Sequence, residues 1–215
     1  MKSFIILGAG RFGASLAKTL YELGHEVLVI DGKEDIVAEI SDHVTHAVIG
    51  DCSDESTLKS LGVRNFDIAV VAIGGNMESS ILVTLMLKEM GVQYIVAKAQ
   101  SNIHARVLSR VGADKVILPE RDMGVRLAQS LSMHNILDFI EVSPRYSILE
   151  ITTPELWIGK SLKDINVRVK HGINILAIKT GDDIDITPDA DRVLNAEDVM
   201  IVIGSNEDLN KLSGR

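Results

Sequence analysis

Phe4-Ile5-Ile6-Leu7-Gly8-Ala9-Gly10-Arg11-Phe12-Gly13 is the stretch that decides the fold of this chain. It joins an apolar run to a Gly-x-Gly-x-x-Gly turn, and a helical pattern of apolar residues follows. This order of strand, glycine turn and helix is typical of a turn that binds phosphate groups. Gly8 permits the tight turn, Gly10 lets the backbone approach a phosphate, and Gly13 lets the helix pack close to the strand. The first backbone N–H groups of the helix would then face the anion.

Two charged side chains extend this motif. Asp31 ends the next apolar run, where a carboxylate accepts hydrogen bonds from ribose hydroxyls and repels a 2′-phosphate. NADP is therefore disfavoured, whereas NAD, ATP, ADP and AMP all remain, because they share the adenosine ribose. Arg11 lies inside the turn, where a guanidinium would grip a terminal phosphate. An arginine that extends into solvent remains the alternative for Arg11, and a surface carboxylate that closes a strand remains the alternative for Asp31.

Composition and charge indicate the fold class and disfavour some partners and compartments. The chain has 215 residues, of which 46% are hydrophobic and only 4% aromatic, and this mix suits buried parallel strands between helices. The net charge of −8 disfavours a nucleic-acid partner. No apolar stretch approaches the roughly 20 residues that span a bilayer, and the chain enters a strand pattern at once, which leaves no room for a signal peptide. With Cys52 as its single cysteine, we expect a cytoplasmic protein without an internal disulfide.

The order of the elements predicts an α/β fold with a second, smaller domain. Strand and helix patterns alternate as far as residue 118, which indicates a Rossmann-like doubly wound parallel sheet with helices on both faces. The strands expected in this sheet are residues 3–8, 26–31, 45–50, 67–73, 94–98 and 115–118. We therefore place a nucleotide-binding domain at residues 1–119.

Residues 120–140 have a helical pattern with more apolar surface than one sheet hides, which predicts crossover helices that pack on a partner subunit. A helix packed on its own domain is the alternative. From about residue 144 the helical periodicity fades, and short strand patterns at 146–152, 173–179, 184–187 and 199–204 follow. We therefore expect a small β-rich α+β domain over residues 141–215.

Residues at the ends of later strands are expected to reach the same ligand, because ligands bind beyond the carboxyl ends of parallel strands. Asp51 and Cys52 follow the third strand, where Asp51 would accept a hydrogen bond from an adenine amino group and Cys52 would pack beside the ring. An ordinary strand-end aspartate is the alternative. Ala72, Ile73 and Gly74 follow the fourth strand and leave space for the ligand.

Two further charged residues end the last strands of the sheet. Lys98 ends the fifth strand and points toward the expected crevice, where it would meet a phosphate or remain solvated. Glu120 follows the sixth strand. Phosphates would repel its carboxylate unless a cation lies between them, which makes Glu120 a candidate metal ligand. The alternative is a carboxylate that is stabilised in the first turn of a helix.

The chain offers a nucleotide site without an evident catalytic apparatus. A dehydrogenase needs an acid–base group beside its nicotinamide, and about 75 residues remain after residue 140, with His171 as their only histidine. No Ser/His/Asp or Cys/His arrangement occurs, and no Gly-Lys-Ser/Thr follows the glycine turn. These features favour a sensor whose shape depends on the bound nucleotide over an enzyme.

The combined motifs resemble the RCK (regulator of conductance of potassium) family over essentially the whole chain, most closely the KtrA- and TrkA-type cytosolic subunits of potassium uptake systems. The resemblance covers an RCK N domain followed by an RCK C domain. Its motifs are Gly8–Gly13, Asp31, Thr45–Val48, Leu61–Asp67, Val96–Ala99, Gly112–Ile117, Pro119–Gly124, Gly159–Leu162, Asn166–Arg168 and Glu197–Gly204.

The resemblance implies a function and partners. Such subunits form homodimers that assemble into an octameric ring beneath a KtrB- or TrkH-like membrane subunit that translocates potassium. ATP and ADP compete for the N-domain crevice and bias the ring between conducting and closed shapes. By resemblance, Arg11 reaches the terminal phosphate, Asp31 the ribose and Asp51 the adenine side. Glu120 matches a carboxylate that helps to bind a divalent cation (magnesium or calcium) or sodium beside the phosphates.

The residues expected to contact nucleotide are Gly8, Gly10, Arg11, Phe12, Gly13, Asp31, Asp51, Cys52, Ala72, Ile73, Gly74 and Lys98. The C domain of some family members binds cyclic di-AMP, and the resemblance places Arg168, Asn174, Ile175 and Pro188 in the matching region. Two alternatives stay open. The same scaffold would serve an NAD(H)-responsive redox sensor, since the adenosine half binds in the same way, or a small NAD-dependent oxidoreductase.

Overall fold

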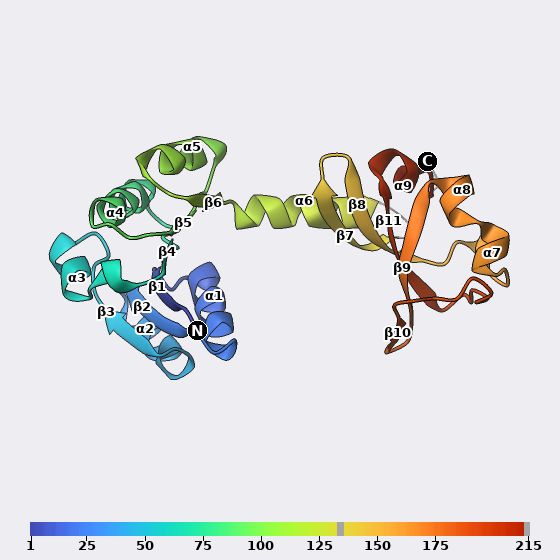
Figure 1. Cartoon of the computed structure of the whole chain (residues 1–215). Coiled ribbons are helices and arrows are strands. Elements are labelled where there is room, and N and C mark those ends of the chain that lie inside the picture. The colour runs from blue at the N-terminus through green and yellow to red at the C-terminus, as the bar shows by residue number, and fades with distance from the viewer. Residues whose placement is uncertain (133–135, 213–215) are drawn as a thin grey trace. The chain divides into compact units, whose positions relative to one another are not determined.

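The computed structural model describes residues 1–132 and 136–212, and it divides into two compact units (Figure 1). Unit 1 comprises Met1–Glu120 and unit 2 comprises Arg121–Arg215. Each unit has its own sheet and its own hydrophobic core, so each is described by itself.

Unit 1 is built on a six-stranded parallel sheet, which confirms the predicted Rossmann-like fold. Its strands are β1 (Ser3–Leu7), β2 (Glu26–Asp31), β3 (His46–Ile49), β4 (Ile68–Val71), β5 (Ile95–Lys98) and β6 (Lys115–Ile117). The order across the sheet is β3-β2-β1-β4-β5-β6, and neighbouring strands are parallel. The direction of winding thus reverses between β1 and β4. Ligands bind at such a switch point in doubly wound sheets.

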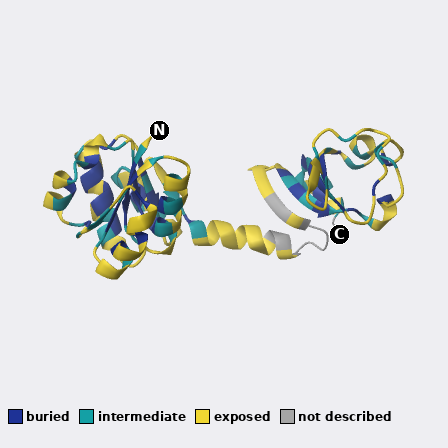
Figure 2. Ribbon diagram, turned by 90° about the horizontal axis from the view of Figure 1, so that it is seen from below, coloured by how far each residue is buried: buried dark blue, intermediate teal, exposed yellow. Residues whose placement is uncertain are grey.

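Helices cover both faces of this sheet and leave its central strands buried between them (Figure 2). They are α1 (Arg11–Glu22), α2 (Glu34–Ile40), α3 (Glu55–Ser60), α4 (Met77–Glu89) and α5 (Asn102–Val111), with 3-10 turns η1 (Ser41–His43) and η2 (Val63–Asn65). Ala17 of α1 and Ile40 of α2 pack in one apolar cluster, and Leu58 of α3, Leu87 of α4 and Leu108 of α5 pack in the other. Because both faces are covered, the central strands β1 and β4 are apolar along most of their length, whereas the edge strands β3 and β6 begin with the exposed residues His46 and Lys115.

The segment after β6 departs from the sequence prediction. Helix α6 (Pro119–Ser132) is followed by strand β7 (Ile136–Ser143), so the helical prediction for residues 120–140 is wrong for residues 136–140. Residues 133–135 lie outside the described part of the chain. The physical reason is antiparallel pairing of β7 with the next strand across a short turn, which suits its β-branched and aromatic residues.

Unit 2 contains a five-stranded antiparallel sheet in the order β10-β9-β11-β8-β7, as expected of a small β-rich α+β domain. Apart from β7, its elements are β8 (Tyr146–Thr152), η3 (Glu155–Trp157), α7 (Leu162–Ile165), α8 (Val167–His171), β9 (Ile173–Thr180), β10 (Asp183–Asp185), β11 (Asp198–Ser205) and α9 (Asn206–Leu212). Alternate residues of β11 are buried, and Met200 and Val202 share a core with Trp157.

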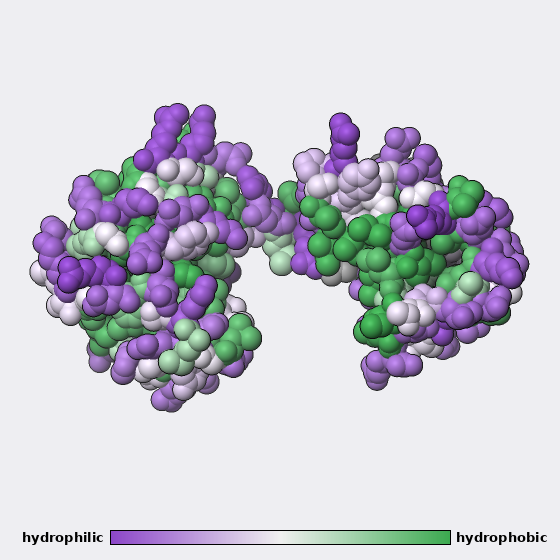
Figure 3. Space-filling model, in the orientation of Figure 1, coloured by the Kyte–Doolittle hydropathy of each residue, from purple (hydrophilic) through white to green (hydrophobic). Residues whose placement is uncertain are grey.

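The surfaces of both units mix polar and apolar residues (Figure 3). Hydrophobic residues reach the surface of unit 2, and exposed ones there include Ile140, Leu176 and Ile184. On α6, the side chains of Met123, Val125, Leu127 and Leu131 are exposed. In the described residues, no helix is both long enough and apolar enough to cross a bilayer.

Candidate functional site

The glycine turn after β1 has a geometry that only glycine satisfies at two positions. Gly8 has a φ of +97°, a left-handed conformation that L-residues with a side chain rarely adopt. Its N–H donates to the carbonyl of Ile30 at 2.8 Å, which ties the turn to β2. A Cβ built on Gly13 would lie 2.0 Å from the carbonyl oxygen of Gly8. The first turn of α1 therefore packs directly on the backbone of the glycine turn.

Gly10 has a different role, because a Cβ built there meets no atom within 4 Å. It is the N-cap of α1, with extended backbone and no side-chain cap, and the first turn of α1 carries no acidic residue. By contrast, the side chains of Asn76 and Ser101 cap α4 and α5. The first N–H groups of α1 thus have no side-chain cap, and an anion would satisfy them.

Asp31 stabilises the glycine turn by hydrogen bonding. Its carboxylate accepts hydrogen bonds from the backbone N–H of Ala9 at 2.7 Å and of Lys33 at 3.0 Å. A carboxylate has about four acceptor positions, so capacity remains for ribose hydroxyls. The spacing of the sequence placed Asp31 beside the turn but gave no sign of its bond to Ala9.

Asp51 and Cys52 lie beside Asp31, beyond the end of β3. Asp51 is exposed, and its carboxylate accepts from the N–H of Ser53 at 2.8 Å. Cys52 is buried, with its sulfur 3.7 Å from the carbonyl oxygen of Ile30. Burial, together with the negative charges of Asp31 and Asp51, raises the pKa of the Cys52 thiol to about 12. The thiol is therefore neutral at physiological pH and suits packing rather than reaction.

We expect Cys52 to react with thiol reagents far more slowly than an ordinary cysteine. A pKa raised from 9.0 to about 12 lowers the thiolate fraction at pH 8 by about 1,000-fold. The same shift makes the folded state lose stability as the pH rises from about 9 toward 12, because the unfolded chain ionises its thiol first. Dithionitrobenzoate kinetics at pH 8 measure the rate, and the protein in urea is the control. Equal rates in the two states would contradict a buried neutral thiol.

The end of β4 forms the other wall of the switch point. The N–H of Ala72 donates to the carbonyl of Leu7 at 2.8 Å, and a Cβ on Gly8 would lie 3.2 Å from the backbone carbon of Ala72. Ile73 is half-buried and Gly74 is exposed, and the side-chain amide of Gln100 donates to the carbonyl of Gly74. The sequence prediction missed Gln100. Its place shortly after β5, beyond Lys98, was the available signal.

Charged side chains from three elements meet beside the glycine turn. Lys98 Nζ, at the end of β5, lies 2.5 Å from Glu120 Oε1, in the first turn of α6. The same ammonium lies 5.6 Å from the centroid of the Phe12 ring of α1. Hydrogen bonds from Lys98 and from the N–H of Glu120, together with the charges of Lys98 and Arg11, hold the pKa of the Glu120 carboxyl below its usual value. Phe12, Lys98 and Glu120 therefore form one cluster, and Arg11 lies near enough for its charge to act on Glu120.

Glu120 does not make a cation site by itself. No group of three or more His, Cys, Asp or Glu side chains with metal-binding geometry occurs among the described residues. A magnesium ion is, however, commonly held by one or two carboxylates together with substrate phosphates. The predicted metal role of Glu120 therefore requires a bound nucleotide to supply further oxygen ligands, and it stays a prediction.

The residues predicted for cyclic di-AMP lie in unit 2 and are spread over three segments. Arg168 is exposed on α8, Asn174 and Ile175 follow on the neighbouring strand β9, and Pro188 lies after β10. The ring of His171, at the end of α8, packs against Trp157 with 5.1 Å between ring centroids. Binding at these positions stays a prediction.

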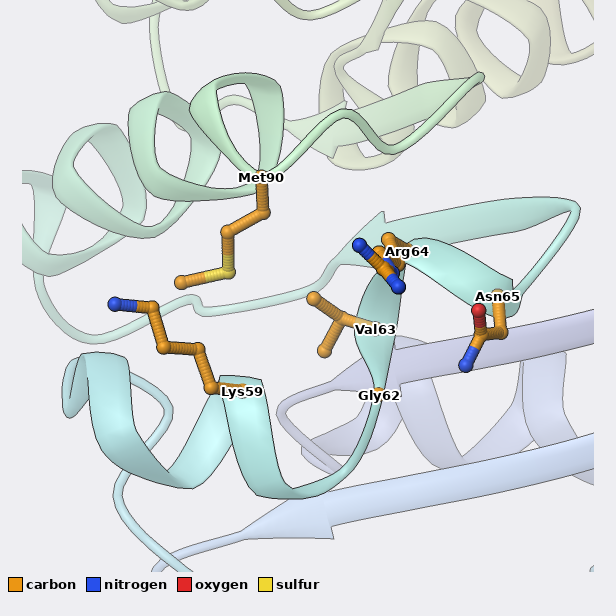
Figure 4. A pocket seen from close by; sticks show the side chains of 6 residues that line it. All are labelled: Lys59, Gly62, Val63, Arg64, Asn65 and Met90. Atoms are coloured by element: carbon orange, nitrogen blue, oxygen red, sulfur yellow. The ribbon is translucent and has the colours of Figure 1, made fainter.

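A pocket of about 460 Å³ lies elsewhere in unit 1, near the ends of α3 and α4 (Figure 4). It is lined by Lys59, Gly62, Val63, Arg64, Asn65 and Met90. The side chains of Lys59, Val63 and Met90 point into the same space. The pocket shares no residue with the predicted nucleotide site, and Lys59 already pairs with Glu55 at 2.6 Å.

Comparisons with known proteins agree with the two-unit division. The TrkA-N domain matches residues 4–119, and the TrkA-C domain matches residues 147–214. The chain is 48% identical over 214 residues to Ktr system potassium uptake protein C of Bacillus subtilis, covering 100% of this chain and 97% of that protein. It is 44% identical over 210 residues to Ktr system potassium uptake protein A of the same organism, covering 98% and 95%.

A solved structure described as "GsuK channel bound to NAD" matches the fold with a TM-score of 0.70 and 18% identity. The match covers 100% of this chain but only 40% of the GsuK chain, so it shows a shared fold. The sequence identities and the two matched domains, in contrast, show the family of the chain. With a TrkA-N domain followed by a TrkA-C domain, and with nearly half of its residues identical to a Ktr potassium uptake protein, the chain belongs to the KtrA-type RCK family.

Proposed function

We propose that this chain is a nucleotide-sensing regulatory subunit of a Ktr- or Trk-type potassium transporter. In this proposal ATP and ADP bind at the glycine turn and control potassium flux through a membrane subunit. The observation that carries it is the start of α1, where N–H groups without a side-chain cap lie beside Arg11 and Lys98. The names of the related Ktr system proteins supply the connection to potassium uptake.

The geometry supports a definite pose for the nucleotide. The adenosine lies toward Asp31 and Asp51, and the phosphates lie over Gly10 and the start of α1. Arg11 and Lys98 then neutralise the phosphate charge, and Glu120 shares a cation with the phosphates. None of these residues forms a nucleophile–base pair, so the nucleotide acts as an effector and not as a substrate. It shifts the shape of the protein only by its differential affinity for two states.

Assembly completes the proposal. Homodimers form an octameric ring on the cytoplasmic face of the membrane and contact a KtrB- or TrkH-like subunit. The exposed apolar side chains of α6, such as Leu127 and Leu131, support packing of this helix on a second copy. The regulatory subunit reaches the membrane through its partner alone.

Calorimetric titration with ATP, ADP, NADH and cyclic di-AMP tests the proposal, each with EDTA and with magnesium or calcium. We expect ATP and ADP to bind, and the divalent cation to strengthen ATP binding. Absence of ATP and ADP binding would overturn the proposed function. Binding of NADH alone would favour the redox sensor, which the NAD-bound GsuK channel makes the second candidate on this fold. Turnover of NADH with a carbonyl substrate would instead favour an oxidoreductase.

Arg11→Ala is expected to weaken ATP binding more than ADP binding. A charge-assisted hydrogen bond contributes about 1.5–3 kcal/mol, so ATP affinity should fall by about tenfold to 100-fold. ADP lacks the terminal phosphate and should lose much less. Arg110→Ala removes an exposed arginine from the last turn of α5, so it is the matched control. Equal losses for ATP and ADP would contradict contact between Arg11 and the terminal phosphate.

A further inference from the structure

Glu120 pairs with Lys98, one of the two cations that are proposed to hold the phosphates. Its carboxylate reaches back from the first turn of α6 to Lys98, at a distance of 2.5 Å. The Glu120 side chain is 66% exposed, whereas that of Lys98 is only 11% exposed. The ion pair therefore lies at the mouth of the crevice, with the ammonium inside and the carboxylate outside.

The ammonium lies where a phosphate would need it. A Cβ built on Gly74 would be 3.9 Å from Lys98 Nζ, which places Lys98 at the end of β4. The aromatic ring of Phe12, one residue after Arg11, lies beneath the same ammonium. Lys98 thus lies between the start of α1, which follows β1, and the end of β4. Glu120 is its anionic partner in this structure.

The charge of Glu120 imitates that of a phosphate oxygen. Carboxylate and phosphate oxygens bind an ammonium in the same way, through short charge-assisted hydrogen bonds. A phosphate that contacts Lys98 must share the ammonium with the carboxylate or replace it. Two anions around one ammonium repel each other unless another cation joins them.

We propose that Glu120 is an internal competitor of the nucleotide phosphates: it binds Lys98 until a phosphate replaces it. This inference rests on the proposed nucleotide function. The exchange frees the Glu120 carboxylate for a divalent cation and breaks the side-chain link between β5 and the start of α6. Because α6 leads from unit 1 into the rest of the chain, the exchange gives nucleotide binding a direct effect on this connecting helix.

Glu120→Gln tests the competition when no divalent cation is present. Glutamine keeps the size of the side chain and removes its charge, so Lys98 becomes available to a phosphate. Because the Glu120 side of this ion pair is open to solvent, we expect the pair to contribute up to about 1 kcal/mol, which corresponds to about two- to fivefold tighter ADP binding in EDTA. If Glu120 acts only as a metal ligand, the variant and the wild type should bind ADP equally in EDTA, and the proposal would be overturned.

A second variant separates competition for Lys98 from simple repulsion between carboxylate and phosphate. In a Lys98→Met background, Glu120→Gln should have little effect on ADP affinity, because the shared ammonium is missing. A full gain in that background would show long-range repulsion and overturn the competition. Lys98→Gln repeats the measurement if the methionine variant does not fold.

One control variant completes the experiment. Glu39→Gln removes an exposed carboxylate from α2 and should leave ADP affinity unchanged. Failure of the proposed function is distinguishable: a wild-type protein that binds no nucleotide overturns both ideas. A wild type that binds ADP, with no tightening in Glu120→Gln, overturns the competition alone.

Discussion

Gly13→Ala is expected to destabilise unit 1 by about 3 kcal/mol or more. The added Cβ would lie 2.0 Å from the carbonyl oxygen of Gly8 and 3.1 Å from its carbonyl carbon. Both atoms belong to backbone that is hydrogen-bonded to β2, so neither can move without breaking the turn. Either α1 shifts away from the sheet or the turn loses its shape.

The single tryptophan allows the unfolding of unit 2 to be followed separately. Trp157 is buried in the core of unit 2, so its fluorescence reports on that unit, whereas far-ultraviolet circular dichroism reports on both. In urea titrations, Gly13→Ala should move the dichroism transition to lower urea and leave the fluorescence transition in place. Gly75→Ala is the control, because a Cβ built there meets no atom within 4 Å. An unchanged dichroism midpoint would contradict the prediction, because it would mean that α1 moves away from the glycine turn with little loss of stability.

Most of unit 1 could be predicted from the sequence because its signals are local. The strands are short, mainly apolar runs, the helices follow from the spacing of their apolar residues, and the glycine turn requires particular residues at fixed spacing. The chain order of strands and helices then leaves few topologies, since parallel crossovers are right-handed. The ends of β1, β2 and β4 therefore met where the sequence placed them.

Strand β7 shows where this reasoning failed. The run Ile136-Leu137-Asp138-Phe139-Ile140 continues the helical spacing of α6 but also suits a strand, and periodicity does not separate the two in so short a segment. Pairing with β8 decides the outcome, and that pairing is a property of the hairpin as a whole. Tertiary context overrode a local pattern here.

Contacts between side chains within the site were also beyond the sequence. Asp31 and Ala9 are 22 positions apart, as are Lys98 and Glu120, and each pair depends on how two elements meet. Residue type and strand position predicted that these residues would face the ligand. They did not predict that Asp31 holds the turn or that Glu120 holds Lys98.

Gly10→Ala is expected to lower ATP and ADP affinity by about 100-fold while leaving the fold intact. The backbone of Gly10, with φ of −62° and ψ of −179°, is open to alanine, and the added Cβ meets no protein atom within 4 Å. The methyl group would instead occupy the space over the start of α1, where the phosphates are proposed to lie. Losing two charge-assisted hydrogen bonds at about 1.5 kcal/mol each corresponds to a loss of this size.

Calorimetry with each nucleotide, together with a urea titration of the same variant, measures both parts of the prediction. Gly75→Ala should change neither the affinity nor the stability. An affinity within about threefold of wild type would mean that Arg11 and Lys98 hold the phosphates at a distance from the backbone. The contrast between Gly10 and Gly13 then separates the two reasons for glycine in this turn, because one position is kept open for the ligand and the other is required by the packing of the protein itself.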